Sequence, residues 1–229
     1  MPEVIQINQD TYRIEDEKSR FFLLIGQQRA LLIDSGRTTV NAKEIAEEIT
    51  SLPIELLNTH ADFDHIAGND AFPFAYMHPS EYVNYFDGGQ KHPLPIGIWD
   101  KQIMDLGDRE LMIISIPGHT PGSVAILDKK YRVLFGGDSI QDGRIYMFGK
   151  YRNMLAYKQS LLKIKEYSNE FDVVYAAHGT FGVPVSLVDD LLAMVVKIEN
   201  EEILYEEILV GSETVRQYSS EVARFLLDR

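Results

Sequence analysis

Four side chains that can bind a metal ion occupy a six-residue stretch of the chain: His60, Asp62, Asp64 and His65. Imidazoles and carboxylates are nitrogen and oxygen ligands that divalent cations take from proteins. Held this close together without a cation, such groups would repel or desolvate one another. The short apolar run Ile54–Thr59 precedes them and predicts a buried strand. The spacing therefore indicates a metal site on a loop at the end of a strand.

Three further candidate ligands lie later in the chain, each directly after a predicted strand. His119 lies in the segment Pro117–Gly122, where prolines and glycines predict a tight turn. Asp138 follows a short apolar run through a pair of glycines, and His178 follows another such run. If these strands share one edge of a sheet, all seven side chains can converge on one point.

Apolar periodicity predicts two successive series of strands and helices. The predicted strands are Val4–Asn8, Tyr12–Glu15, Phe21–Gly26, Ala30–Asp34, Ile54–Thr59, Phe74–Met77, Glu110–Ile116, Ser123–Asp128, Arg132–Phe135 and Val173–Ala177, with a final strand or hairpin over Thr214–Leu227. The predicted helices are Val40–Leu52, Ser80–Phe86 with Ser80 as its cap, Leu155–Tyr167 and Ser186–Asn200. Asp87–Trp99 is predicted to be an irregular loop or lid, and the acidic stretch Glu199–Glu207 a solvated helix surface. The order indicates two sheet-plus-helix halves packed face to face, with the helices outside.

Composition limits the classes of function. A chain of 229 residues with 45% apolar content can bury one sizeable core, and the absence of a linker-like stretch favours a single domain over 1–229. The net charge of −13 argues against nucleic-acid binding. The longest apolar runs are too short to cross a membrane, and no secretory signal is visible, so we expect a cytoplasmic protein. The lack of cysteine excludes disulfides, thiolate ligands and a cysteine nucleophile.

Taken together, these segments resemble the metallo-β-lactamase superfamily. Thr59–His65 resembles its His-x-His-x-Asp-His motif, and Pro117–Ser123, Phe135–Ser139 and Ala177–Gly179 resemble its later motifs in the same order and spacing. The resemblance implies an α/β fold of the four-layer αββα sandwich type. It also places Asp34 beside the ligands as a supporting carboxylate.

The resemblance implies two divalent metal ions, typically zinc in this family. It assigns the ligands as His60, position 62 and His119 for the first ion, Asp64, His65 and His178 for the second, and Asp138 as a bridge. Position 62 departs from the family, because Asp62 replaces the usual histidine. Three interpretations stay open: Asp62 ligates directly, as a glutamate does in the related flavodiiron proteins; it is too short to reach; or the site has decayed.

Charge favours direct ligation. Two divalent cations bring four positive charges, and Asp62, Asp64, Asp138 and a bridging hydroxide bring four negative ones, so the cluster is neutral. A carboxylate at position 62 would also shift the preference of the site from zinc towards manganese or iron, which favour oxygen ligands.

The predicted function is a binuclear metal-dependent hydrolase that attacks the carbonyl of a small ester, thioester or lactone. The metals would lower the pKa of a shared water to supply hydroxide and would polarise the carbonyl. Asp64 would orient the nucleophile or accept its proton, and Tyr146 is a candidate donor to the oxyanion. The alternative, motivated by Asp62, is a non-haem mono-iron or di-iron oxidoreductase of the sulfur dioxygenase or flavodiiron kind. A metal-poor binding protein on the same fold is a third hypothesis.

Overall fold

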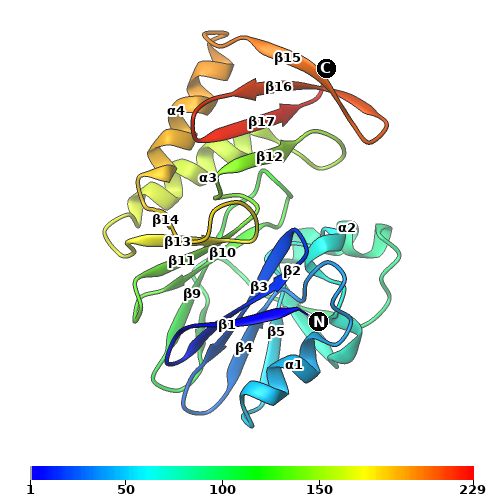
Figure 1. The fold of residues 1–229 in the computed structure, drawn as a ribbon, viewed down its shortest axis with the longest axis vertical. Helices are drawn as coiled ribbons and strands as arrows, with labels where there is room; N and C mark the ends of the chain where they lie inside the picture. Colours follow the sequence, from blue (N-terminus) through cyan, green and yellow to red (C-terminus); the bar gives the residue numbers. More distant parts are fainter. Residues whose placement is uncertain (1) are drawn as a thin grey trace. The chain divides into compact units, whose positions relative to one another are not determined.

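The computed structural model describes residues 2–229 and divides into two compact units, unit 1 up to Ile114 and unit 2 from Ser115 (Figure 1). This division falls inside the strand with which the sequence predicted the second series of elements to begin. Among the described residues, no helix combines the length and the apolar character needed to cross a lipid bilayer.

Within its described residues, unit 1 is built on a seven-stranded sheet whose strands follow one another in chain order. The strands are β1 (Glu3–Asn8), β2 (Thr11–Asp16), β3 (Ser19–Ile25), β4 (Ala30–Ile33), β5 (Ile54–Leu57), β6 (Phe74–Met77) and β7 (Leu94–Gly97). The pairs from β1 to β4 are antiparallel, and those from β4 to β7 are parallel. Parallel neighbours need crossovers, and these carry α1 (Ala42–Ile49), the single turns η1 (Phe63–His65), η2 (Asn69–Ala71) and η3 (Pro79–Glu81), and α2 (Tyr82–Asp87).

The core of unit 1 follows from the pattern of its sequence. Strand β4 is buried at every position, as expected for a strand covered on both faces. Helix α1 turns Ala42, Ile45 and Ala46 inwards and its charged side chains outwards. These residues belong to one apolar cluster with Leu56 and Phe72. Burial of this cluster fixes the strands on which the candidate ligands depend.

A buried arginine joins the first strands of unit 1 to the hairpin of β8 (Ile103–Asp105) and β9 (Glu110–Ser115). Arg109 is 1% exposed, and its guanidinium donates to the backbone oxygens of Asp10 and Ile25 and to the hydroxyl of Thr11. Because this cation is buried, these acceptors replace the water that it lost.

Two sequence predictions for unit 1 were wrong in part. The stretch Asp87–Trp99 is not irregular throughout, because β7 pairs in parallel with β6 within it. The glycines and prolines hid this strand, which lies at the edge of the sheet, where proline is tolerated. Ser80 does not cap the short helix α2, whose N-cap residue is Glu81 and has no side-chain cap hydrogen bond. The His78 ring instead caps the preceding turn η3, where it accepts from the Ser80 N–H.

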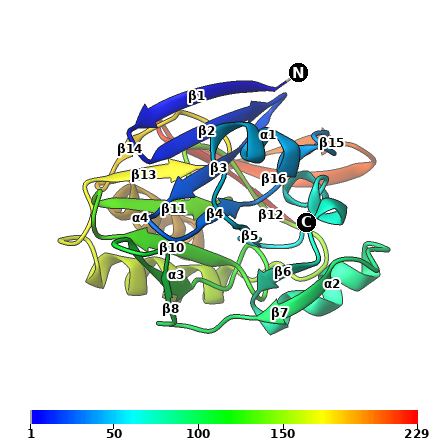
Figure 2. The same cartoon turned by 90° about the horizontal axis from the view of Figure 1, so that it is seen from below.

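Unit 2 contains four neighbouring sheet strands in the order β14 (Val183–Pro184), β13 (Val173–Ala176), β11 (Val133–Gly137) and β10 (Val124–Asp128). A separate sheet has the order β12 (Gly143–Met147), β17 (Ala223–Leu227), β16 (Glu213–Ser219) and β15 (Tyr205–Val210). Helices α3 (Met154–Glu166) and α4 (Leu187–Glu199) lie side by side (Figures 1 and 2). The ring contact between Tyr157 and Phe225 joins α3 to β17.

The sequence predicted α3, α4 and the final hairpin but not β12 or β15. The acidic stretch Glu199–Glu207 was predicted to be helical, but α4 ends at Glu199 and β15 begins at Tyr205. Strand β15 is an edge strand and is mostly exposed, so it lacks the buried apolar alternation from which strands are recognised.

Candidate metal centre

The ligand cluster of unit 1 lies on the loop that follows β5. Strands β4 and β5 are parallel, so the residues that follow them, Asp34 and His60, leave the same edge of the sheet. The His60 and His65 side chains are each 1% exposed, whereas those of Asp62 and Asp64 are 21% and 15% exposed. The imidazoles are therefore anchored in the protein, while the carboxylates stay accessible to an ion.

Asp34 fixes both imidazoles. One of its oxygens accepts from the Thr59 N–H at 2.7 Å; the other accepts from the Thr59 hydroxyl and from Nδ1 of His65, both at 2.8 Å. Because the Thr59 hydroxyl gives its only proton to Asp34, its oxygen must accept at its 3.1 Å contact with Nδ1 of His60. Both rings thus carry their proton on Nδ1, so Nε2 is the nitrogen whose lone pair could bind a metal ion.

The loop is held by further buried polar groups that the sequence analysis did not find. The amides of Asn58 and Asn69 bond to each other, and Asn58 also donates to the backbone oxygen of His65. Ser35 donates its N–H to the same oxygen at 2.9 Å and its hydroxyl to the side-chain oxygen of Asn69 at 2.7 Å. A buried asparagine with satisfied donors has no distinctive sequence pattern, so only coordinates reveal this support.

A second carboxylate of unit 1, Asp16, positions the loop that follows β4. Its Oδ2 atom accepts three backbone N–H groups, from residues 37 to 39, at 2.6, 2.7 and 3.0 Å. The loop places the Arg37 guanidinium 4.9 Å from the centre of the Phe63 ring and 4.0 Å from Oδ2 of Asp64. Arg37 therefore brings a positive charge beside a candidate ligand in a strongly acidic protein.

In unit 2, His119 lies in the tight turn that the sequence predicted. The turn passes so close to α3 that a Cβ on Gly118 would lie 2.4 Å from Cα of Tyr157, and Gly118 has a φ of +145°. Nδ1 of His119 bonds to the backbone oxygen of Tyr146 at 2.9 Å. Because a carbonyl only accepts, Nδ1 carries the proton, and Nε2 is again the nitrogen whose lone pair could bind a metal ion.

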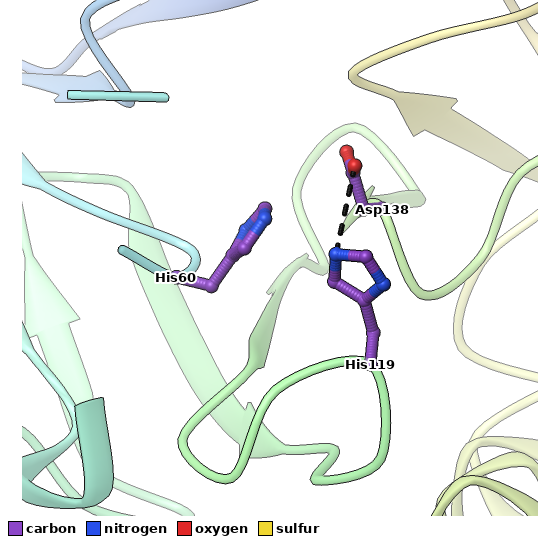
Figure 3. Close-up of side chains that lie close together, drawn as sticks. All are labelled: His60, His119 and Asp138. Carbon is purple, nitrogen blue, oxygen red and sulfur yellow. Dashed lines mark ion pairs between the residues drawn. The ribbon is translucent and has the colours of Figure 1, made fainter. Parts of the chain in front are cut away.

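The Asp138 carboxylate lies between two imidazoles of unit 2. Strands β11 and β13 are parallel neighbours, so Asp138 and His178 follow them at the same sheet edge. Oδ2 of Asp138 lies 3.7 Å from Nε2 of His119 (Figure 3). Oδ1 of Asp138 lies 3.2 Å from Nε2 of His178. Each oxygen thus faces a different histidine, as a bridging carboxylate requires.

The donor spacings within each unit fit divalent ions. Two ligands on a tetrahedral ion with bonds of about 2 Å lie roughly 3.3 Å apart. The within-unit spacings are 3.6 Å from His60 Nε2 to Asp62 Oδ2 and 3.9 Å from His65 Nε2 to Asp64 Oδ1, besides the two to Asp138. Three of the four spacings are longer than an ordinary N–H···O hydrogen bond, and only the 3.2 Å between Asp138 and His178 lies within that range. The nitrogen and oxygen donor set therefore suits a transition metal such as zinc, manganese or iron.

The structure thus brings together the four candidate ligands of unit 1 with each other, and the three of unit 2 with each other. Asp34 supports the ligands as predicted, and Thr59 adds to this support. The Tyr146 ring lies 5.9 Å from the ring of Phe148, and the Tyr146 backbone orients His119. A role for its hydroxyl as oxyanion donor stays a prediction.

Comparison with protein families matches residues 16–178 to the metallo-beta-lactamase superfamily. The acyl-coenzyme A thioesterase MBLAC2 of Gallus gallus is 23% identical over 195 residues, which cover 69% of this chain and 70% of that protein. The hydroxyacylglutathione hydrolase of Nitrosomonas eutropha is 30% identical over 174 residues, which cover 74% of this chain and 64% of that protein.

Among solved structures, a metallo-beta-lactamase from Pontibacter korlensis is similar, with a TM-score of 0.75 and 17% identity over 86% of this chain and 99% of that one. The metallo-beta-lactamase IND-7 has a TM-score of 0.70 and 18% identity, over 86% of this chain and 98% of that one. At these identities the likeness shows the fold alone, and it confirms the fold class predicted from the sequence.

Proposed function

Because this chain belongs to the metallo-beta-lactamase superfamily and is a metal-dependent hydrolase of that type, we propose that it cleaves thioester bonds of small acyl thioesters. The relatives named above are a thioesterase for acyl-coenzyme A and a hydrolase for hydroxyacylglutathione, two substrates that share an acyl group on sulfur. The observation that best supports dependence of this activity on a metal is that the Nδ1 atoms of His60, His65 and His119 are all engaged in hydrogen bonds, so that their Nε2 atoms can face an ion.

We further propose that the ligands of the two units share two divalent ions. The first ion would be held by His60, Asp62 and His119, the second by Asp64, His65 and His178, and Asp138 would bridge them. The family match, which spans all seven positions, supports this assignment. The within-unit spacings of the donors are those of side chains that can bind metal ions. When bound, such ions supply Lewis acidity to a carbonyl oxygen and lower the pKa of water.

The chain's own residues would prepare the reaction in three ways. Asp34 holds the His60 and His65 rings so that neither has to reorient when substrate arrives. Asp64 would orient the attacking water and accept its proton. Arg37, which lies beside Asp64, would attract an anionic group of the substrate.

Thioester chemistry also suits the side chains present. A thiol has a pKa of about 8.5, so a thiolate leaves without prior protonation, whereas an amide nitrogen needs a general acid. Cleavage of a thioester therefore asks only for a nucleophile and for stabilisation of the oxyanion.

The test is release of thiol from a panel of acyl-coenzyme A and acylglutathione thioesters by protein loaded with a defined metal. A disulfide reagent that reports thiols suits this assay, because the chain has no cysteine to react. We expect turnover that is lost on removal of metal and in Asp138→Ala. Absence of turnover across the thioesters, with hydrolysis of lactones or phosphoesters instead, would refute the proposed substrate class.

Asp62 favours a second candidate, a non-haem iron oxidoreductase, because its Oδ2 atom lies 3.6 Å from Nε2 of His60 and adds an oxygen donor. Elemental analysis of protein purified without added metal separates the two functions. Two iron ions per chain together with oxygen consumption would support the redox function, whereas zinc or manganese with thiol release supports hydrolysis.

A further inference from the structure

The side chain of Asp62 is held by a clamp of two residues, Glu81 at the end of η3 and Asn84 in α2. Figure 1 shows the position of α2 in the fold. The Asn84 side-chain amide donates to Oδ1 of Asp62 at 3.1 Å and to Oε2 of Glu81 at 3.3 Å. The same Glu81 oxygen accepts from the backbone N–H of Ala61 at 2.9 Å. The contacts form a closed ring that returns to the ligand loop one residue before Asp62.

Glu81 decides which way the Asn84 amide faces. Glu81 is 0% exposed, and its oxygen is an acceptor, so the amide must present its NH₂ group on this side. The NH₂ group has two protons, one for each carboxylate. The reversed amide would place its own oxygen against two carboxylates and would be repelled. The clamp therefore accepts a carboxylate at position 62 and disfavours a ring N–H, which would meet a second donor.

The clamp also separates the two oxygens of Asp62. Oδ1 is engaged by Asn84, and Oδ2 is the oxygen 3.6 Å from Nε2 of His60. Aspartate is short, so its reach depends on where the loop and its χ angles place it. A fixed Oδ1 leaves Oδ2 as a single, directed oxygen donor beside the imidazole.

We propose that Asn84, held by Glu81, is a positioning residue that makes Asp62 a one-oxygen metal ligand and so shifts the selectivity of the first site from zinc towards manganese or iron. This inference rests on the metal centre of the proposed function. Imidazole ligands favour zinc over manganese, and an added carboxylate narrows that difference. Loss of the clamp would release Asp62, leave a site richer in nitrogen and therefore weaken manganese more than zinc.

The test is competition between the two metals. Metal-free protein is dialysed against equal concentrations of Mn²⁺ and Zn²⁺, and the ratio of the metals retained per chain is measured by elemental analysis. Mutation of a residue that holds a metal ligand in place typically lowers the affinity of the site for its metal 10- to 100-fold. We therefore expect Asn84→Leu to lower the retained manganese-to-zinc ratio by about tenfold or more, and Asp62→His to lower it as well.

A double variant separates positioning from general damage. If Asn84 acts through Asp62, then adding Asn84→Leu to Asp62→Ala, which has no side-chain oxygen for Asn84 to hold, leaves the ratio of Asp62→Ala unchanged. Asn200→Leu is the matched control, since the Asn200 amide also donates to a carboxylate, that of Glu202 at 3.0 Å, but contacts no candidate ligand. Its ratio should equal that of the native protein.

The smaller variant Asn84→Ala removes the same donors and serves if the leucine does not fold. The electron paramagnetic resonance spectrum of bound Mn²⁺ gives a second readout, which should change in both Asn84 variants. An unchanged manganese-to-zinc ratio in a folded Asn84 variant would overturn the inference. So would an Asn84→Leu substitution that lowers the ratio equally in proteins with and without the Asp62 carboxylate. Because neither readout uses turnover, failure of thioester hydrolysis would refute the proposed function and leave this result intact.

Discussion

Replacing Asp34 by asparagine tests how far one carboxylate controls the ligands of unit 1. Asp34 has a φ of +63°, a conformation that asparagine adopts about as readily as aspartate. The substitution therefore leaves the backbone unstrained and changes only the hydrogen bonds. The structure gives Asp34 three donors: the Thr59 N–H on one oxygen, and the Thr59 hydroxyl and Nδ1 of His65 on the other.

An asparagine cannot serve all three donors. If its oxygen faces the Thr59 hydroxyl and His65, its NH₂ group meets the Thr59 N–H, and two donors oppose each other. In the reverse orientation the NH₂ group meets Nδ1 of His65 and drives the ring proton to Nε2, the atom that has to bind metal. Loss of a partner of this kind lowers metal affinity about 10- to 100-fold, which corresponds to about 1.4–2.7 kcal/mol.

The assay is zinc binding to metal-free protein in competition with a chromophoric chelator. Asp105→Asn is the control, because that carboxylate accepts from the Gly107 N–H and contacts no candidate ligand. We expect the Asp34 variant to release zinc to the chelator at much lower chelator concentration than the native protein or the control. Equal zinc affinity in all three proteins would show that Asp34 does not set the imidazoles.

Three further predictions concern stability. Burial raises the pKa of Asp16, but hydrogen bonds from a threonine hydroxyl and backbone N–H groups outweigh it, so the pKa lies below the ordinary 3.8. A lowered folded-state pKa gives stability that is present above about pH 4 and is lost as the pH falls through that pKa. The unfolding free energy from urea titrations over this range should therefore depend less on pH in Asp16→Asn than in the native protein. An equal pH dependence in the two proteins would contradict the lowered pKa of Asp16. Gly118→Ala forces a Cβ against Tyr157 and should lower the unfolding free energy by about 3 kcal/mol. The control Gly143→Ala, with a φ of +78° and open space around its Cβ, should lower it by about 1 kcal/mol. Equal losses in the two variants would argue against the close approach of Gly118 to Tyr157. Tyr157→Phe removes a buried 2.7 Å hydrogen bond from the tyrosine hydroxyl to the Ser139 carbonyl. The unfolding free energy measured by calorimetry should therefore fall by about 1 kcal/mol. An unchanged unfolding free energy would mean that the carbonyl finds another donor.

The sequence predicted the parts of the fold that buried apolar residues define. Strands β4 and β5 and helix α3 lie within a few residues of their predicted bounds, because their apolar periodicity reflects one buried face or two. Strands β7 and β15 lie at sheet edges and expose much of their surface, so no such pattern marks them.

The candidate ligands were also predictable, because His and Asp residues at strand ends in a recurring order are rare by chance. Apart from Asp34, the residues that support these ligands were not predictable. Asn84 lies 22 residues after Asp62 and on a helix, and asparagine on a helix surface is common. Thr59 could be recognised only from its position next to Asp34, which depends on the parallel pairing of β4 and β5. Side chains that act through another residue carry no motif of their own.

The guanidinium of Arg109 has a consequence for how unit 1 matures on the ribosome. Its bond to the backbone oxygen of Asp10 spans 99 residues of chain. The N-terminal hairpins, although made first, therefore wait for nearly the whole of the first half to be synthesised before that cation locks their ends in place. The apolar cluster that joins Ile14 and Phe21 to Leu56 needs only residues made earlier, so it can form before this last link closes.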